Sequence, residues 1–370
     1  MKKIYWCSNC INASTRNRIT FDKNGKCNAC QWVEEKKNLN WKKRKSELVK
    51  ILNKYRSKNN SYDCIVPVSG GKDGSYVAHT LKHVYGMNPL TVTSRPPLTR
   101  SIGNENLNNF VKSGYAHLHI TADEEIMRSY NRLGLTDIGM PYYGWLISIF
   151  TSVIRTAVNF NIPLIFYGED GEVEYGGSDE SKNIPYFDYN YMKRIYLEDG
   201  YNKITKKVIK RHKRNFWFSL PEDKYLKSLN LKLLHMSYYE NWDPYKNYLI
   251  AKKHCGLVER KINNSGTFTN FAQNDQKLYP LHTYLMFLKF GFGRATQDAN
   301  IDVRRSSMTR DQAINLAKLY DNEYPNLYLN DYLKYYDMNK KKFNQILDKW
   351  ANRNLLKKIK NKWVTKFDIK

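Results

Sequence analysis

The sequence predicts an α/β protein, with a parallel β-sheet covered by helices, a small cysteine-bearing module before the sheet and a helical part after it. Short apolar runs alternate with helix-like segments between residues 62 and 170, and this alternation is typical of parallel sheets. Four of the six cysteines stand in two CxxC pairs near the N-terminus. From residue 325 onward the chain is basic and aromatic with a helical pattern.

Length and charge set the first limits. The chain has 370 residues, enough for a main domain with additions. Its apolar runs fall short of the roughly 20 residues of a membrane span, and "MKKIYWCSNC" lacks the apolar stretch of a signal peptide, so we expect a cytoplasmic protein. Lys plus Arg number 61 against 35 Asp plus Glu, a net charge of +26. This excess indicates either a generally basic surface or an anionic partner, such as nucleic acid, nucleotides, phosphorylated substrates or an anionic membrane.

The cysteine spacing predicts a zinc ribbon over residues 1–33. Each CxxC pair turns the backbone so that two thiolates reach one ion, and two pairs close a tetrahedral shell, which makes the site structural. Two disulfides are disfavoured in a reducing cytoplasm, and a redox CxxC does not come as a pair. Cys64 and Cys255 stand alone, and we interpret them as packing residues. The expected zinc ligands are Cys7, Cys10, Cys27 and Cys30.

A linking helix is expected over 34–60, and the chain then turns into an anion-binding motif. Residues 62–68 form an apolar strand, two glycines follow at its carboxyl end, and a helical pattern runs from there to Gly86. Glycines let backbone N–H groups converge, and the start of a helix adds its positive end. The turn therefore suits a phosphate chain, although it matches neither GxxxxGK[ST] nor GxGxxG. Its residues are Ser69, Gly70, Gly71, Lys72, Asp73, Gly74 and Ser75.

Further strands are expected at 88–94, 116–122 and 162–170, with a clear helix at 142–160. Ligands of parallel sheets sit at the carboxyl ends of strands, so the turn at 69–75, residues 93–95 and residues 168–170 should surround one cleft. The acidic run after the last strand either holds Mg²⁺ or deprotonates an amine, or it is a solvated loop. We interpret His117 and His119 as structural. The acidic residues are Glu169, Asp170, Glu172 and Glu174.

The motif Ser69-Gly-Gly-Lys-Asp73 after an apolar strand resembles the PP-loop of ATP pyrophosphatases, which cleave ATP between the α and β phosphates. More narrowly, "VSGGKDGSYVAH", "YGMNPLTVT", "NIPLIFYGED" with "EVEYGG", and "LKFGFGRATQDANIDVR" together resemble the N-acetyl sugar amidotransferases of bacterial surface-polysaccharide and nonulosonate biosynthesis. The resemblance spans nearly the whole chain. One departure concerns Ser75, which stands one place later than the serine of the superfamily's Ser-Gly-Gly-x-Asp-Ser.

The resemblance implies a PP-loop (HUP-like) domain over 61–240, a helical substrate-binding part over 241–325 and a helical C-terminal subdomain over 326–370. It implies that ATP adenylates the acetamido oxygen of a nucleotide-linked N-acetyl sugar, and that ammonia then displaces AMP to leave an acetamidino group. The ammonia would come from a separate glutaminase with a channel-forming synthase, a pair like that of histidine biosynthesis. The lipopolysaccharide O-antigen is the expected product pathway.

The strand end Val92–Ser94 is expected to face the adenine, as strand-end backbone often does in nucleotide-binding folds, and the other roles combine the resemblance with the chemistry of each residue. The expected ATP-binding residues are Ser69, Gly70, Gly71, Lys72, Asp73, Gly74, Ser75, Thr91, Thr93 and Gly168. The expected catalytic residues are Lys72, Asp73, Glu169 and Asp170, with Asp73 holding Mg²⁺. The expected substrate-binding residues are Glu174, Lys289, Arg294, Asp298 and Arg304, with the alternative that the arginines only form salt bridges at a helix end. Thr309 and Gln312 fit a capping box that opens the following helix.

Two other classes of function remain open on the sequence. A PP-loop enzyme that modifies tRNA, by thiolation or otherwise, would explain the ribbon and the net charge of +26 together. Thiolation usually needs two catalytic cysteines, and only Cys64 and Cys255 lie outside the ribbon. A non-catalytic zinc-ribbon adaptor leaves the glycine turn unexplained. Nucleic acid is therefore the less favoured partner.

Overall fold

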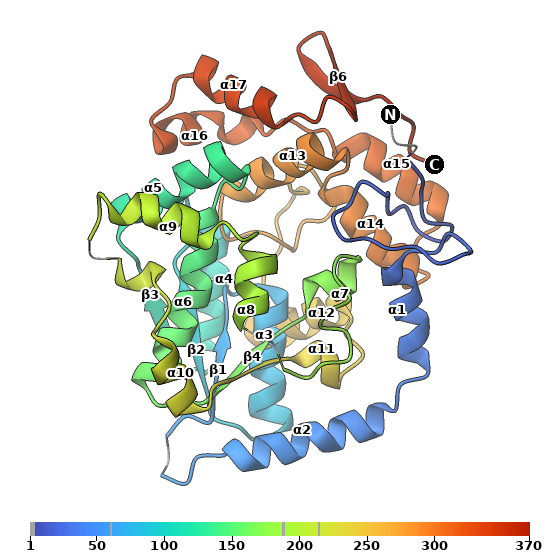
Figure 1. The fold of residues 1–370 in the computed structure, drawn as a ribbon. Helices are drawn as coiled ribbons and strands as arrows, with labels where there is room; N and C mark the ends of the chain where they lie inside the picture. The colour runs from blue at the N-terminus through green and yellow to red at the C-terminus, as the bar shows by residue number, and fades with distance from the viewer. Residues whose placement is uncertain (1–3, 60, 187–188, 214) are drawn as a thin grey trace.

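The computed structural model describes residues 4–59, 61–186, 189–213 and 215–370, and it contains a five-stranded parallel sheet (Figure 1). The spatial order is β3-β2-β1-β4-β5, with all neighbours parallel. β2 and β3 are therefore added on one side of β1, and β4 and β5 on its other side. The strands are β1 (Cys64–Pro67), β2 (Pro89–Ser94), β3 (His117–Ile120), β4 (Leu164–Tyr167) and β5 (Lys232–His235). The predicted α/β class is confirmed, and the first four strands fall within the predicted ranges. β5 was not predicted.

Each face of the sheet packs on its own apolar layer. Ile65 of β1 belongs to a core shared with the long helix α6 (Tyr143–Asn159). Its neighbours Cys64 and Val66 belong to a second core, shared with α3 (Lys72–His79) and α12 (Pro244–Cys255). Because side chains alternate across a strand, one short strand supplies both layers. The turn after β1 therefore emerges between two packed helical layers.

Other helices continue these layers or connect them. The segment after α3 includes the π-helical turn η1 (Thr80–Val84), then α4 (Ser101–Lys112), α5 (Glu124–Leu133) and η2 (Gly134–Ile138). After β4 come α7 (Gly171–Tyr175), α8 (Tyr189–Tyr191), η3 (Met192–Tyr196), α9 (Tyr201–Ile209), η4 (Phe216–Phe218) and α10 (Asp223–Leu229). The short α11 (Met236–Tyr239) follows β5.

The N-terminal part differs from the prediction in one respect. The expected single linking helix over 34–60 is two helices, α1 (Asn28–Lys37) and α2 (Trp41–Tyr55). α1 begins directly after Cys27, so Cys30 lies on the helix itself. Residues 38–40 separate the two helices. The Asn40 side chain accepts a hydrogen bond from the backbone N–H of Lys43 and caps α2.

The C-terminal part is helical, as predicted, but it ends in a β-hairpin. Its helices are α13 (Leu278–Phe290), α14 (Arg294–Arg304), α15 (Arg310–Tyr320), η5 (Asn326–Tyr328), α16 (Leu329–Tyr336) and α17 (Lys340–Trp350). The hairpin pairs β6 (Leu356–Ile359) with β7 (Lys362–Thr365). Its two turn residues, Lys360 and Asn361, have φ of 45° and 64°, the left-handed geometry of a tight hairpin turn. The predicted capping box of Thr309 and Gln312 is confirmed.

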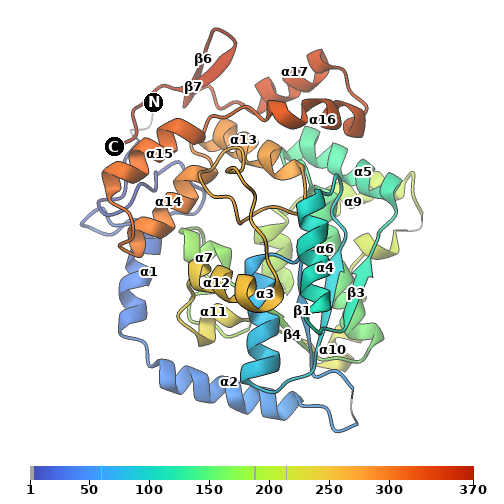
Figure 2. The ribbon, with the colours of Figure 1, turned by 180° about the vertical axis from the view of Figure 1, so that it is seen from behind.

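The N-terminal module lies against the C-terminal helices (Figure 2). The backbone N–H of Ile11 donates to Asn300 of α14 at 2.8 Å, and the Asn300 amide donates to the Asn12 side chain at 2.9 Å. Ile11 also packs with Ala299, Ala313 and Ala317. No helix among the described residues is long and apolar enough to cross a membrane.

Candidate active site

The four N-terminal cysteines converge on one point. All four are buried, and their Sγ atoms lie within 4.8 Å of one another. The Cys7–Cys30 and Cys10–Cys27 sulfurs are 3.8 and 3.7 Å apart. A zinc ion 2.3 Å from four tetrahedral sulfurs needs sulfurs about 3.8 Å apart. The donor set therefore fits structural Zn²⁺, with no position left open.

The glycine turn after β1 is shaped by close backbone contacts. Gly70 has φ of +79°, and a Cβ there would lie 2.4 Å from the backbone nitrogen of Leu107. A Cβ at Gly74 would lie 2.6 Å from the carbonyl oxygen of Pro67. Helix α3 thus packs directly on the end of β1, which explains why a glycine stands where the superfamily pattern has serine. Ser75 is fully buried and its hydroxyl has no hydrogen-bond partner among the described residues.

A polar cavity of about 220 Å³, called here the loop cavity, opens at this turn. Its walls come from the turn, from the end of β4, from α14 and from the irregular segment 271–275. The predicted site residues that line it are Ser69, Gly71, Lys72, Asp73, Gly74, Glu169 and Arg294. Backbone N–H groups at a helix start, together with Lys72 and Arg294, form a suitable environment for phosphates.

Lys72 and Asp73 are paired to each other at the start of α3. The amide of Asn247 on α12 donates to Asp73 Oδ1 at 3.1 Å, which orients the carboxylate. Gly168 lies behind this pair, and a Cβ there would be 3.0 Å from the Trp242 ring and 3.4 Å from the Asp73 Cβ. Carboxylate oxygens are the ligands that Mg²⁺ prefers, so Asp73 is a suitable ligand for Mg²⁺ carried by a triphosphate.

Glu169 is a carboxyl group of the loop cavity with an altered acidity. Burial raises the pKa of Glu169 to about 7, and the charge of Asp73 adds to the shift. The Tyr175 hydroxyl donates to Glu169 Oε1 at 3.3 Å. The other oxygen, Oε2, is buried and has no partner among the described residues. A carboxyl group with a pKa near neutrality is suited to proton transfer.

The rest of the acidic run is used to hold the chain. Asp170 caps α7 by accepting the backbone N–H of Glu172 at 3.0 Å, and its carboxylate also accepts the hydroxyls of Tyr196 and Ser181. It is 6% exposed and does not line the loop cavity, so its carboxylate holds the chain here, and its place in the chemical step stays a prediction. Glu172 makes a bidentate pair with Arg18 of the ribbon, both contacts at 2.9 Å.

Glu174 is bound by helix α1. It accepts the indole N–H of Trp32 at 2.9 Å and the ammonium of Lys36 at 2.9 and 2.7 Å. The Asn28 amide donates to the Gly177 carbonyl at 2.8 Å. The ribbon and α1 therefore bind the loop that carries Glu169 and Tyr175 through hydrogen bonds and ion pairs. The sequence pattern did not predict this contact.

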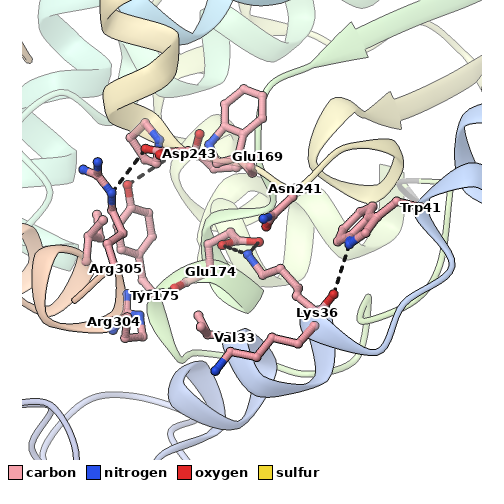
Figure 3. A pocket seen from close by; sticks show the side chains of 14 residues that line it. Val33, Lys36, Trp41, Glu169, Glu174, Tyr175, Asn241, Asp243, Arg304 and Arg305 are labelled. Atoms are coloured by element: carbon pink, nitrogen blue, oxygen red, sulfur yellow. Dashed lines mark hydrogen bonds and ion pairs between the residues drawn. The ribbon is translucent and has the colours of Figure 1, made fainter. Parts of the chain in front are cut away.

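Two more cavities adjoin the loop cavity. The aspartate cavity, of about 360 Å³, contains Asp298 and Asp302 and shares Lys72, Tyr175 and Arg294 with the loop cavity. The tryptophan cavity, of about 280 Å³, contains Trp41 and Trp242 and shares Glu169 and Tyr175 with the loop cavity. Figure 3 looks into the tryptophan cavity, where Lys36 reaches Glu174 and Arg305 reaches Asp243. Tyr175 lines all three cavities.

The predicted substrate residues separate into two groups. Arg294 pairs with Asp298 at 2.8 Å, and Thr267 donates to Asp298 at 2.6 Å, so these side chains are fixed at the aspartate cavity. Arg304 lines the tryptophan cavity together with Glu174. Lys289 lies elsewhere, because its ammonium donates to the carbonyl of Ile138 and lies near the Trp350 ring.

The two predicted threonines are enclosed in the sheet. Thr91 is fully buried and its hydroxyl donates to the Ala116 carbonyl at 2.7 Å, while the Thr93 hydroxyl donates to the Val68 carbonyl. The Ser94 carbonyl accepts the indole N–H of Trp145 at 3.0 Å. A contact between β2 and an adenine stays a prediction, and the threonine side chains are not free to make it.

Sequence reasoning missed the segment 271–275. Asp275 lines the loop cavity, and burial raises its pKa to about 6. Its backbone carbonyl accepts the N–H of Arg100 at 3.0 Å, which fixes the segment beside the start of α4. This segment has no periodic pattern, and only the fold brings it to the glycine turn.

Comparison with known proteins gives a match in the C-terminal part. Residues 265–368 match a family described as the C-terminal domain of WbpG-like LPS biosynthesis proteins. No curated protein matches the chain. Among solved structures, the chain is similar to a predicted subunit of a tRNA methyltransferase from Methanocaldococcus jannaschii, with 13% identity, a TM-score of 0.29, and coverage of 57% of this chain and 82% of that one. This likeness carries no argument about function. The family match relates the segment that contributes Arg294 and Asp298 to proteins of LPS biosynthesis.

Proposed function

We propose that the protein is an ATP-dependent amidotransferase that converts the acetamido group of a nucleotide-linked N-acetyl sugar to an acetamidino group in LPS O-antigen biosynthesis. One observation carries the proposal. The loop cavity joins the Ser-Gly-Gly-Lys-Asp turn to Arg294, and Arg294 belongs to the segment that matches an LPS biosynthesis family. The glycine turn and the family-matched segment therefore line the same cavity.

The proposed chemistry has two steps. In the first, the amide oxygen attacks the α-phosphorus of ATP, the bond between the α-phosphorus and the bridging oxygen breaks, and pyrophosphate leaves with the electron pair. Lys72 and Arg294 neutralise the charge that develops on the leaving group. Asp73 would hold the Mg²⁺ ion, which supplies further charge neutralisation.

In the second step, ammonia attacks the carbon of the adenylated imidate. A C–N bond forms, the attacking nitrogen gives one proton to Glu169, and the C–O bond breaks so that AMP leaves with the electron pair. Glu169 suits this role because the pKa of its carboxyl group is raised to about 7, mainly by burial. We propose that a partner glutaminase and a channel-forming synthase supply the ammonia.

The lone cysteines support this proposal over tRNA thiolation. Cys64 and Cys255 are buried, and burial raises the pKa of both thiols, that of Cys255 to about 11. Neither lines the loop cavity. A thiol with a raised pKa is a poor nucleophile at neutral pH.

The decisive experiment measures AMP and pyrophosphate release from ATP with UDP-linked N-acetyl sugars or with bulk tRNA, both with ammonium present. We expect sugar-dependent turnover, and we expect Asp73→Asn to abolish it while the fold persists. Asp337→Asn is the matched control, because its carboxylate is exposed on the turn before α17 and its φ of 50° suits asparagine. Turnover that depends on tRNA alone would contradict the proposal.

A further inference from the structure

The three cavities divide unequally around the reactive groups. Glu169 lines the loop cavity and the tryptophan cavity, whereas Lys72 and Arg294 line the loop cavity and the aspartate cavity. Among the described residues that line the aspartate cavity, Glu169 does not occur. The carboxylate and the two cations therefore share the loop cavity but line different adjoining cavities.

This division indicates where the amine and the sugar amide would each bind. A general base must lie within hydrogen-bond reach of the proton that it accepts. If the loop cavity holds the phosphates, the tryptophan cavity is the adjoining cavity that Glu169 also lines. The amide oxygen needs the opposite side, where Lys72 and Arg294 neutralise charge and where Asp298 and Asp302 offer acceptors for hydroxyl groups.

We infer that the tryptophan cavity is the compartment of a neutral amine nucleophile and that the aspartate cavity holds the N-acetyl sugar. The inference rests on the proposed function and assigns its two substrates to separate spaces.

The walls of the tryptophan cavity suit an uncharged amine. Val33, Ile301, Pro244 and the rings of Trp41 and Trp242 make them largely apolar. Lys36 pairs with Glu174 at 2.7 Å and Arg305 with Asp243 at 3.4 Å (Figure 3), while Lys37 and Arg304 add two further cations to the wall. An apolar space whose wall holds more cations than carboxyl groups favours the neutral form of an amine over its cation.

Residues that line the wall carry three unpartnered polar atoms. The indole Nε1 of Trp242 and Nη1 of Arg304 are buried donors with no acceptor among the described residues, and Glu169 Oε2 has no donor there. Buried polar groups usually have partners, so this wall suits a guest that can both accept and donate hydrogen bonds. Ammonia and methylamine have a lone pair and N–H groups. An ammonium ion has only donors and leaves the indole N–H unpaired.

Helix α1 gives this compartment its outer wall. Val33, Lys36 and Lys37 come from α1, which starts within the four-cysteine module. The cysteine module therefore has a second role besides stability, because it encloses the space next to Glu169.

Filling each cavity separately tests the assignment by steady-state kinetics. Val33→Trp occupies the tryptophan cavity, and we expect it to raise the KM for ammonium about tenfold or more while the KM values for ATP and the sugar nucleotide stay unchanged. Ser307→Trp occupies the aspartate cavity and should raise only the KM for the sugar nucleotide. Val49→Trp, on the exposed face of α2, is the control for a surface tryptophan. A Val33→Trp effect on the sugar nucleotide alone, or no effect at all, overturns the assignment.

A binding measurement tests the amine site without turnover. The chain has eight tryptophans, so ¹⁵N-labelled indole signals are few, and Trp242→Phe identifies the signal of Trp242. Titration of the wild-type protein with methylamine at alkaline pH should shift that signal and leave most others in place. Absence of any shift overturns the inference. A shift in a protein that shows no sugar-dependent pyrophosphate release would instead count against the proposed function alone.

Discussion

Glu169 and Asp170 are neighbours in the sequence, yet their carboxyl groups have different hydrogen-bond surroundings in the structure. Asp170 accepts hydrogen bonds from Tyr196, Ser181 and the start of α7. Glu169 has one partner, Tyr175, and an oxygen without any among the described residues. The sequence could place both at a strand end, but it could not tell which one would be consumed by a helix cap. That distinction depends partly on side chains more than ten residues away, Ser181 and Tyr196.

The pH dependence of stability should reveal the burial of Glu169. Its pKa is raised from 4.5 to about 7, mainly by burial, so between these values the folded protein holds a proton that the unfolded chain releases. Stability conferred by that proton is present at low pH and is lost as the pH rises to about 7. We expect Glu169→Gln to be more stable than the wild type at pH 8, by up to about 3 kcal/mol, and nearly equal to it at pH 4.

Denaturant unfolding at several pH values, without ATP or Mg²⁺, measures this difference. Glu105→Gln, at an exposed position on α4, is the control and should follow the wild type at every pH. A constant offset between Glu169→Gln and wild type across the pH range would show that the pKa of Glu169 is not raised in the folded protein.

At the scale of elements, the strands were predictable and the loops between distant elements were not. Apolar runs at 62–68, 88–94, 116–122 and 162–170 contain β1 to β4, because buried parallel strands need continuous apolar residues. β5 was missed because "LKLLH" is short and lies between two short helices, α10 and α11. The acidic loop was predicted to lie at the site because it follows β4. Its contact with α1 was not predicted, because it joins residues about 140 positions apart, as in the Lys36–Glu174 pair. No local pattern encodes that contact.

Removing zinc should loosen α7 before it affects the sheet. Helix α7 has five residues, too few to be stable alone, and Arg18, Trp32 and Lys36 hold it. After chelation of zinc, or in Cys27→Ser, we expect faster amide hydrogen exchange in residues 171–177 and unchanged exchange in β1 and β4. Mass-spectrometric hydrogen exchange measures both regions in one experiment.

Cys255→Ser is the matched control for this experiment, since it replaces a buried cysteine outside the four-cysteine cluster. It should retain zinc and normal exchange in residues 171–177. Full zinc content in Cys27→Ser would refute the assignment of Cys27 as a ligand, and unchanged exchange after zinc loss would refute the coupling to α7.

At the scale of the molecule, the C-terminal residues share the core of the sheet. Tyr332, Tyr336 and Phe343 belong to the same apolar cluster as Ile65 of β1. The Tyr336 hydroxyl donates to the Pro141 carbonyl, just before α6. The proposed boundary at 326 therefore marks a change in local pattern, and the packing is continuous across it.

A core mutation in α17 should consequently destabilise the whole protein. Phe343 is fully buried, and we expect Phe343→Ala to cost about 3 to 5 kcal/mol and to lower a single cooperative melting transition. Leu319→Ala, at a side chain that is 69% exposed, should change stability by less than about 0.5 kcal/mol. Calorimetry distinguishes the cases, because an independently folding C-terminal unit would melt in a separate transition.

The docking of the cysteine module onto α14 has a consequence for synthesis of the chain. The module is made first, but its partner Asn300 is made about 290 residues later. At 5 to 20 residues per second, this delay is roughly 15 to 60 s. During that interval, a bound metal ion is the main agent that can hold the four cysteines together, since the surface that later buries them does not yet exist. The yield of native protein should therefore depend on the zinc available while the chain is being synthesised, and not only on the zinc available afterwards.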